Sequence, residues 1–252
     1  MEWNIIHIEE TDSTNRYLTS HGDCPSVRDL TRGLSPCEVV WADYQTAGRG
    51  CGTNTWESER GRNLLFSILL HPTGVLAADQ FILSMANALA LRDTLAEYID
   101  DVTIKWPNDI YWRDCKICGT LIETTLKGQH IGDCIIGTGI NVNQYGFHSD
   151  APNPVSLCQV LGHEVDREEL LGKVLDKLAR YMGMVADGLW DSIRSHYRRH
   201  LYRLGKTAPY RFPDGREELC WLVNVTDDGH LELFHDHCQT YLLAFKEVQF
   251  VV

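Results

Sequence analysis

The chain has 252 residues, of which 44% are hydrophobic and 23% charged, enough for one sizeable core and a small appendage. Its formal net charge of −12 argues against a general nucleic-acid-binding protein. No apolar run approaches the roughly 20 residues of a membrane span, and the acidic N-terminus lacks the basic region of a signal peptide. The nine irregularly spaced cysteines fit reduced thiols in a cytoplasmic protein better than a disulfide framework.

Apolar patterning predicts alternating strands and helices over the first two hundred residues. The expected strands cover 3–9, 38–44, 63–71 and most of 102–143, and the continuous apolar run at 63–71 is typical of a buried strand. The expected helices cover 14–21, with Asp12 or Ser13 as its N-cap, 77–98, 166–186, with Asp166 as its N-cap, and 189–202.

From about residue 206 the pattern changes to short alternating runs separated by "PDG" and "DDG" turns. Such a pattern is typical of a small antiparallel barrel. The expected fold is therefore α+β: a mixed β-sheet with helices over residues 1–203, followed by a small C-terminal β-barrel over residues 204–252.

The stretch "YQTAGRGCGTNTW" (44–56) combines several glycines, which have no side chain, with a single cationic residue. Its glycines, Gly48, Gly50 and Gly52, allow backbone N–H groups to approach an anion closely. Arg49 adds a planar fork that matches phosphate or carboxylate oxygens. A turn that binds nothing is the alternative, since turns also collect glycine.

The stretch "KWPND" (105–109) predicts a second anion-binding segment. Pro107 restricts the backbone, so that Lys105, Asn108 and Asp109 are held rigidly. A cation, an amide and a carboxylate in one rigid segment suit a phosphate with its Mg²⁺. The alternative is a proline turn with surface charges.

Three weaker motifs remain. "DSTN" (12–15) offers hydroxyl and amide groups at a helix start, where capping alone explains two of them. "GTGIN" (137–141) lacks the third glycine and the following helix of a dinucleotide fingerprint. "CKIC" (115–118) has redox or zinc spacing, and "HDHC" (235–238) could complete a zinc site. Zinc is the less favoured interpretation, because "CKIC" lies at a strand entry with no helix N-terminus to activate a thiol.

Together these motifs resemble the biotin protein ligase family. "STN", "YQTAGRG…W", "KWPND", Lys116 with Gly119 and Glu123, and "GxGIN" occur in the family's order and spacing. The resemblance implies the biotin/lipoate ligase catalytic fold with an SH3-like C-terminal barrel. It also implies an enzyme that joins biotin to ATP, giving biotinyl-5′-adenylate, and then acylates a lysine of a biotin carboxyl carrier protein domain of a carboxylase. The implied small molecules are biotin, ATP and Mg²⁺.

The resemblance also implies roles for individual residues. Biotin's carboxylate is already ionised, so the first step needs cations that hold two anions together, and Arg49, Lys105 and Lys116 supply them. Asp109 is the candidate base for the incoming lysine, so the expected catalytic residues are Lys116, Arg49 and Asp109. The expected binding residues are Ser13, Thr14, Asn15, Gln45, Gly48, Gly50, Cys51, Trp56, Lys105, Asn108, Gly119, Gly137 and Asn141.

Within that set, the polar side chains Ser13, Thr14 and Gln45 suit biotin's neutral ureido ring. Trp56 covers the adenylate or the valeryl chain, while Asn108 and Asn141 reach the nucleotide or its metal. No residue is predicted as a dedicated metal ligand.

One departure from the family pattern lies in the glycine-rich loop. The family commonly has Arg or Gln after "GRG" and further arginines before the tryptophan, whereas this chain has Cys51, Gly52 and Thr53. We therefore expect weaker retention of the adenylate. The chain starts directly at the catalytic motifs, so DNA binding through an N-terminal winged helix is not expected, and a homodimer is left open.

Two alternatives stay open. A lipoate or octanoate protein ligase shares the fold, although "STN" and Gln45 favour biotin. A non-catalytic module that binds biotin or the carrier is the other; the presence of both Lys105 and Lys116 argues against it.

Overall fold

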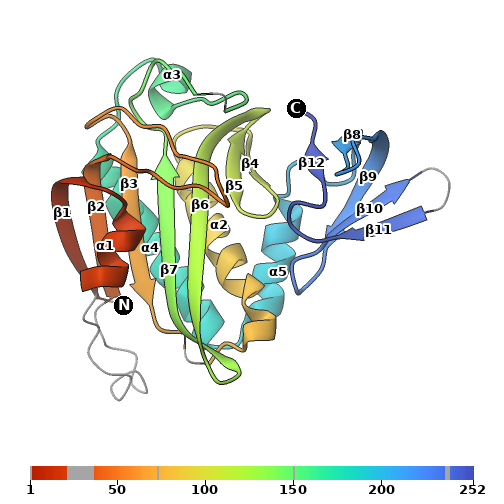
Figure 1. Cartoon of the computed structure of the whole chain (residues 1–252), viewed down its shortest axis with the longest axis horizontal. Helices are drawn as coiled ribbons and strands as arrows, with labels where there is room; N and C mark the ends of the chain where they lie inside the picture. Colours follow the sequence, from red (N-terminus) through yellow and green to blue (C-terminus); the bar gives the residue numbers. More distant parts are fainter. Residues whose placement is uncertain (1, 22–36, 73, 150, 236–238) are drawn as a thin grey trace.

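The computed structural model describes residues 2–21, 37–72, 74–149, 151–235 and 239–252. This part of the chain contains two β-sheets, and the helices pack mainly around the first of them (Figure 1). The elements of the first sheet and its helices are β1 (Trp3–Thr11), α1 (Thr14–His21), β2 (Cys37–Gln45), β3 (Leu64–Leu70), α2 (Phe81–Leu95), β4 (Val102–Lys105), β5 (Asp109–Trp112), β6 (Cys115–Lys127), β7 (His130–Ile140), α3 (Leu157–Leu161), α4 (Arg167–Ala186) and α5 (Trp190–Arg199). The C-terminal sheet contains β8 (Thr207–Arg211), β9 (Glu217–Val225), β10 (Leu231–His235), β11 (Gln239–Leu243) and β12 (Gln249–Phe250).

The first sheet is mixed, as the sequence predicts. Its strand order is β1-β2-β3-β7-β6-β5-β4; β1 and β2 are parallel, and the other neighbours are antiparallel. Strand β3 lies between β2 and β7 and is buried at every residue, which explains its continuous apolar run. Helix α1 lies on one face of the sheet, and α2, α4 and α5 lie on the other (Figure 1).

The helices at the back of the sheet also confirm the sequence predictions. Helix α2 packs against β4 and β5 on one side and against α4 and α5 on the other, so it is apolar nearly all round. A short 3₁₀ turn (Ala77–Asp79) precedes it, so the predicted helix over 77–98 is shorter than expected. Asp166 caps α4 by accepting hydrogen bonds from the backbone N–H groups of Glu168 and Glu169. Helix α3, which has only five residues, was not predicted.

The C-terminal segment forms the predicted antiparallel β-structure. Its strand order is β11-β10-β9-β8-β12, and among the described residues no ladder joins β11 to β12, so this sheet is open rather than a closed barrel. Its apolar residues join the same contiguous core as the first sheet. The indole N–H of Trp106 donates to the carbonyl of Gly229 at 2.9 Å, which ties the two sheets together. The division at residues 203 and 204 stays a prediction.

In the described part of the chain, no helix is long and apolar enough to cross a membrane.

Candidate active site

Three glycines form the floor of the candidate site, on the face of the first sheet that carries α1. Gly119 of β6 is paired with Gly139 of β7, and Gly137 lies two residues before Gly139. A β-carbon at Gly119 would lie 2.7 Å from the ring of Trp56. At Gly139 it would overlap the same ring, and at Gly137 it would overlap Asn15. The glycines of "GTGIN" therefore allow the side chains of Trp56 and Asn15 to lie close to the sheet, and they do not form a phosphate-binding loop.

A cluster of neutral polar side chains lies beside this floor, where α1 begins. The backbone N–H and the hydroxyl of Thr14 both donate to Oε1 of Gln45, at 2.8 and 3.1 Å. The hydroxyl of Ser67, on β3, lies 2.7 Å from Oγ1 of Thr14 and 2.6 Å from Oδ1 of Asn15. Ser13, Thr14, Asn15 and Ser67 are buried. This neutral, preorganised cluster can bind an uncharged polar group.

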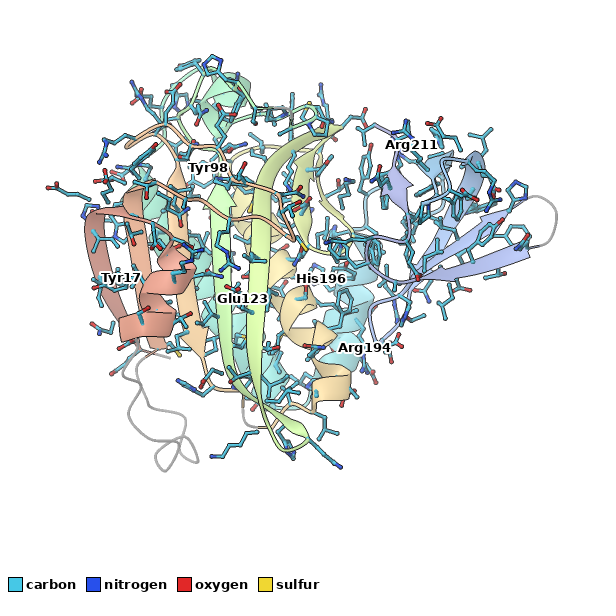
Figure 2. The ribbon with its side chains drawn as sticks, viewed as in Figure 1. Tyr17, Tyr98, Glu123, Arg194, His196 and Arg211 are labelled. Atoms are coloured by element: carbon cyan, nitrogen blue, oxygen red, sulfur yellow. The ribbon has the colours of Figure 1, made fainter. Side chains whose placement is uncertain are left out.

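Glu123 connects that cluster to the glycine-rich loop. It lies on β6 near the middle of the sheet (Figure 2). Its carboxylate accepts a hydrogen bond of 2.7 Å from Nδ2 of Asn15. Arg49 binds both carboxylate oxygens, with Nη2 2.9 Å from Oε1 and Nη1 3.2 Å from Oε2. Glu123 therefore holds the guanidinium in a two-point ion pair. The sequence analysis identified Glu123 only as part of a motif.

A second ion pair joins the two other predicted catalytic residues. Nζ of Lys116 donates to Oδ2 of Asp109 at 2.7 Å, and both side chains are about three-quarters buried, with 29% and 24% exposed. The peptide bond between Trp106 and Pro107, within the "KWPND" motif, is cis. The ion pair brings Lys116, near the start of β6, next to Asp109, the last residue of "KWPND" and the first of β5.

Lys105 lies on β4, directly opposite Asp109 of β5. Its ammonium is 4.9 Å from the centre of the Tyr111 ring and 5.3 Å from that of Phe250, so aromatic faces surround it. Burial lowers the pKa of Lys105 from its usual value of 10.5, and the Asp109 carboxylate partly opposes this effect. Lys105 is thus a third cation of the site, in a more apolar environment than a surface lysine.

The glycine-rich loop is a narrow hairpin that places Trp56 on the glycine floor. The N–H of Trp56 donates to the carbonyl of Gly48 at 3.1 Å, and the N–H of Gly50 donates to the carbonyl of Asn54 at 2.8 Å. Cys51 is half-buried in this hairpin. The indole N–H of Trp56 is buried and has no hydrogen-bond partner among the described residues. A buried N–H group without a partner, above glycines that carry no side chains, indicates a place where a ligand can enter between the indole and the sheet.

Asn141, for which a nucleotide or metal role stays a prediction, forms hydrogen bonds within the protein. It is buried, and its Nδ2 donates to the carbonyl of Val155 at 3.1 Å, while its backbone N–H donates to Ile117. These bonds fasten the segment before α3 to the end of β7. Asn108, in contrast, lies at the half-buried turn between β4 and β5, beside Asp109.

The "CKIC" motif lies at the start of β6, as predicted, with Cys118 buried. Burial raises the pKa of the Cys118 thiol, which makes it unreactive. In the described ranges no group of three His, Cys, Asp or Glu residues could hold a metal ion. Residues 236–238 of the "HDHC" motif lie outside the described residues.

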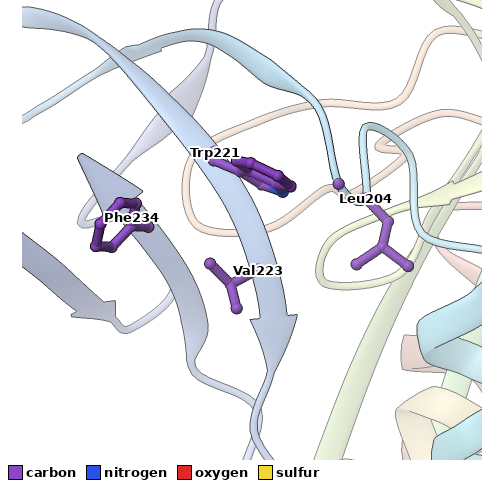
Figure 3. Close-up of a pocket in the computed structure, with 5 residues that line it drawn as sticks. Leu204, Trp221, Val223 and Phe234 are labelled. Carbon is purple, nitrogen blue, oxygen red and sulfur yellow. The ribbon is translucent and has the colours of Figure 1, made fainter. Parts of the chain in front are cut away.

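A separate hollow lies on the C-terminal sheet (Figure 3). Its lining contains no ionisable side chain and consists of Leu204, Gly205, Trp221, Val223 and Phe234. The hollow therefore lacks the groups needed to bind phosphate or to move a proton, and the chemistry belongs to the glycine floor of the first sheet.

Comparison with known proteins agrees with this geometry. Residues 10–141 match the model of the "Biotin/lipoate A/B protein ligase family". A biotin–[acetyl-CoA-carboxylase] ligase of Paracoccus denitrificans is 32% identical over 207 residues, which cover 79% of this chain and 81% of the relative. The bifunctional ligase/repressor BirA of Salmonella typhimurium is 33% identical over 178 residues, which cover 69% of this chain but only 52% of BirA. The chain thus spans about half the length of that relative.

Solved structures show the same fold over the whole chain. The biotin protein ligase of Aquifex aeolicus, in complex with biotin and ATP, has a TM-score of 0.78 and 24% sequence identity. The match covers 98% of this chain and 99% of that one. The ligase of Leishmania major in complex with biotinyl-5-AMP has a TM-score of 0.62 and 23% identity, and covers 96% of this chain and 98% of that one.

Proposed function

This chain belongs to the biotin/lipoate A/B protein ligase family, and we propose that it is a biotin protein ligase. In this proposal it activates biotin with ATP as biotinyl-5′-adenylate and transfers the biotinyl group to a lysine of a biotin carboxyl carrier protein domain. The observation that carries the proposal is the juxtaposition of three cations with a neutral polar cluster across one glycine floor. Biotin requires both environments, because its ring is neutral and its carboxylate is charged.

The neutral end of the site suits the ureido group. Thr14, Gln45 and Ser67 offer hydroxyl and amide groups that both donate and accept hydrogen bonds. An alkyl substrate such as octanoate would cover this cluster without forming hydrogen bonds to it, and each polar group that loses water without gaining a partner costs about 1–3 kcal/mol. The cluster therefore favours biotin over a plain fatty acid.

The charged end suits adenylation. A carboxylate oxygen of biotin attacks the α-phosphorus of ATP, the bond between the α-phosphorus and the bridging oxygen breaks, and pyrophosphate leaves with the electron pair. Both reactants are anions, so Arg49, Lys105 and Lys116 contribute by lowering their repulsion and by stabilising charge in the transition state. No base is needed, because the attacking carboxylate is already ionised.

Transfer needs a base, and we assign it to Asp109. The carrier lysine must lose a proton before its amine attacks the acyl carbon, after which AMP leaves. Lys116 contacts Oδ2 of Asp109, and Oδ1 is the oxygen that we assign to the incoming proton. The ion pair with Lys116 holds the Asp109 carboxylate in place between turnovers.

We assign Mg²⁺ to the phosphates of ATP, which supply most of its oxygen ligands in nucleotide sites. Asn108 and Asp109 are the protein oxygen donors that suit it. The cytoplasmic location and a homodimer also stay predictions.

Pyrophosphate release by the purified protein tests the proposal, with MgATP and either biotin, lipoate or octanoate. Release that depends on biotin, followed by labelling of a carrier domain, supports it. Release with lipoate or octanoate but not biotin would make the chain a lipoate-type ligase, which the family name also covers. Tight biotin binding in calorimetry without any release would make it a binding module.

A further inference from the structure

The turn between β11 and β12 reaches from the C-terminal sheet to the glycine-rich loop. A β-carbon added at Gly52 would lie 2.6 Å from Nζ of Lys246, so the lysine occupies the space that a side chain at position 52 would need. Both residues have left-handed backbone conformations, with φ of 70° at Gly52 and 74° at Lys246. Such a conformation is uncommon for lysine, and it often marks a functional position.

Three contacts hold this turn in place. The N–H of Ala244 donates to Oε2 of Glu247 at 2.7 Å, and the N–H of Glu247 donates back to the carbonyl of Ala244 at 3.1 Å. The ring of Phe245 packs edge-on against Trp106, with 6.0 Å between the ring centres. Because Trp106 belongs to "KWPND", the turn that carries Lys246 is fastened to the candidate active site itself.

The charges of the site leave a role for one more cation. Arg49 is paired with Glu123, and Lys116 is paired with Asp109. With Lys105, these side chains carry a net charge of only +1, whereas biotin and ATP together bring several negative charges. Residues 51–55 of the loop contain no cation. Lys246 is exposed, and it forms no ion pair with any carboxylate of the described residues.

We propose that Lys246 is a phosphate-binding residue of the ligase site. Its ammonium, held beside Gly52, binds the outer phosphates of ATP and thereby supplies from the C-terminal sheet the positive charge that the loop lacks. Phosphate is the chemistry that fits, because an exposed ammonium is a strongly hydrated point charge suited to phosphate oxygens. The inference rests on the proposed function and adds a residue to it.

The test compares three variants by biotin-dependent pyrophosphate release. We expect Lys246→Ala to raise the KM for MgATP roughly five- to tenfold, with the KM for biotin and kcat within about twofold of wild type. Lys246→Arg keeps the charge, so its KM for MgATP stays near the wild-type value. Lys127→Ala removes an exposed lysine at the end of β6, far from the site, and is the matched control for net charge.

Calorimetry with inorganic pyrophosphate gives a second readout that does not depend on biotin chemistry. Lys246→Ala should bind pyrophosphate several-fold more weakly than wild type, and Lys246→Arg about as tightly. A folded Lys246→Ala protein with unchanged KM for MgATP and unchanged pyrophosphate affinity would overturn the inference, as would a Lys246→Arg variant as impaired as alanine. If wild type releases no pyrophosphate with biotin, the proposed function fails, while the pyrophosphate titration still tests Lys246.

Discussion

Removing the ammonium of Lys116 is the sharpest test of how the site works. Its Nζ lies 2.7 Å from Oδ2 of Asp109, and only 29% of the lysine side chain is exposed. A preorganised charge of this kind contributes about 2–4 kcal/mol to a transition state that gathers negative charge. Lys116→Ala should therefore slow adenylation about 30- to 1000-fold. The alanine variant also leaves the Asp109 carboxylate without its cation, which adds repulsion toward phosphate.

The assay is single-turnover formation of biotinyl-adenylate with enzyme in excess over biotin, alongside thermal unfolding of each variant. Asp109→Asn combined with Lys116→Ala should adenylate faster than Lys116→Ala alone, because the unpaired carboxylate is gone. Lys127→Ala, at the far end of β6, should behave as wild type. An adenylation rate within threefold of wild type in a folded Lys116→Ala protein would refute the electrostatic role.

Three further predictions concern the site, and a fourth concerns His200, the residue at the C-terminal end of α5. Asp109→Asn should slow transfer to the carrier lysine more than adenylation in separate single-turnover assays; equal losses would assign Asp109 to ATP or Mg²⁺ instead. Arg49→Ala should weaken biotin and adenylate binding in calorimetry while the unfolding midpoint changes little, since its partner Glu123 is 38% exposed and tolerates solvation. Burial lowers the pKa of Lys105 below 10.5, so the KM for MgATP should rise with pH on the alkaline side as the ammonium is lost, and Lys105→Arg should remove this rise. Burial also lowers the pKa of His200 from 6.5 to about 4, so between these pH values the unfolded protein binds a proton at His200 and the folded protein does not. The urea midpoint of unfolding should therefore fall as the pH decreases from 6.5 to 4, and it should fall less for His200→Phe.

The sequence predicts the main elements well where one physical signal dominates. Strand β3 is a continuous apolar run because both its faces are covered, and α4 begins where the Asp166 carboxylate caps it. Helix α3 is not predicted, because five residues are too few to show a helical period. Its only signal in the sequence is the capping box that Ser156 and Gln159 form at its start.

The site is only partly predictable, because its contacts join segments far apart in the chain. Lys116 and Asp109 are seven residues apart, and their pairing follows from a hairpin, whereas Glu123 meets Arg49 across 74 residues. Ser67 also gives no signal, since a serine inside an apolar strand is more often a simple core residue than a binding group. The hydrogen bond from the amide of Asn141 to the carbonyl of Val155 is equally invisible in the sequence, and the binding role of Asn141 stays a prediction.

The position of Trp56 over the glycine floor implies how the loop acts in the proposed catalysis. Trp56 covers Gly119 and Gly139, so a ligand that uses this floor must displace the indole, which can then cover the ligand from above. Glycine at position 52, with its left-handed φ of 70°, raises the entropy that the loop loses on closing by roughly 0.5–1 kcal/mol relative to alanine. The closed loop is therefore less stable and opens more easily, which helps ATP to enter but also lets the adenylate leave. Lys246, which lies beside Gly52, helps ATP to bind but does not oppose the loss of the adenylate, because the outer phosphates that it binds in our proposal have left as pyrophosphate by then. In the proposed mechanism, adenylate retention therefore depends chiefly on Trp56 and on Arg49, whose guanidinium exchanges Glu123 for the adenylate phosphate.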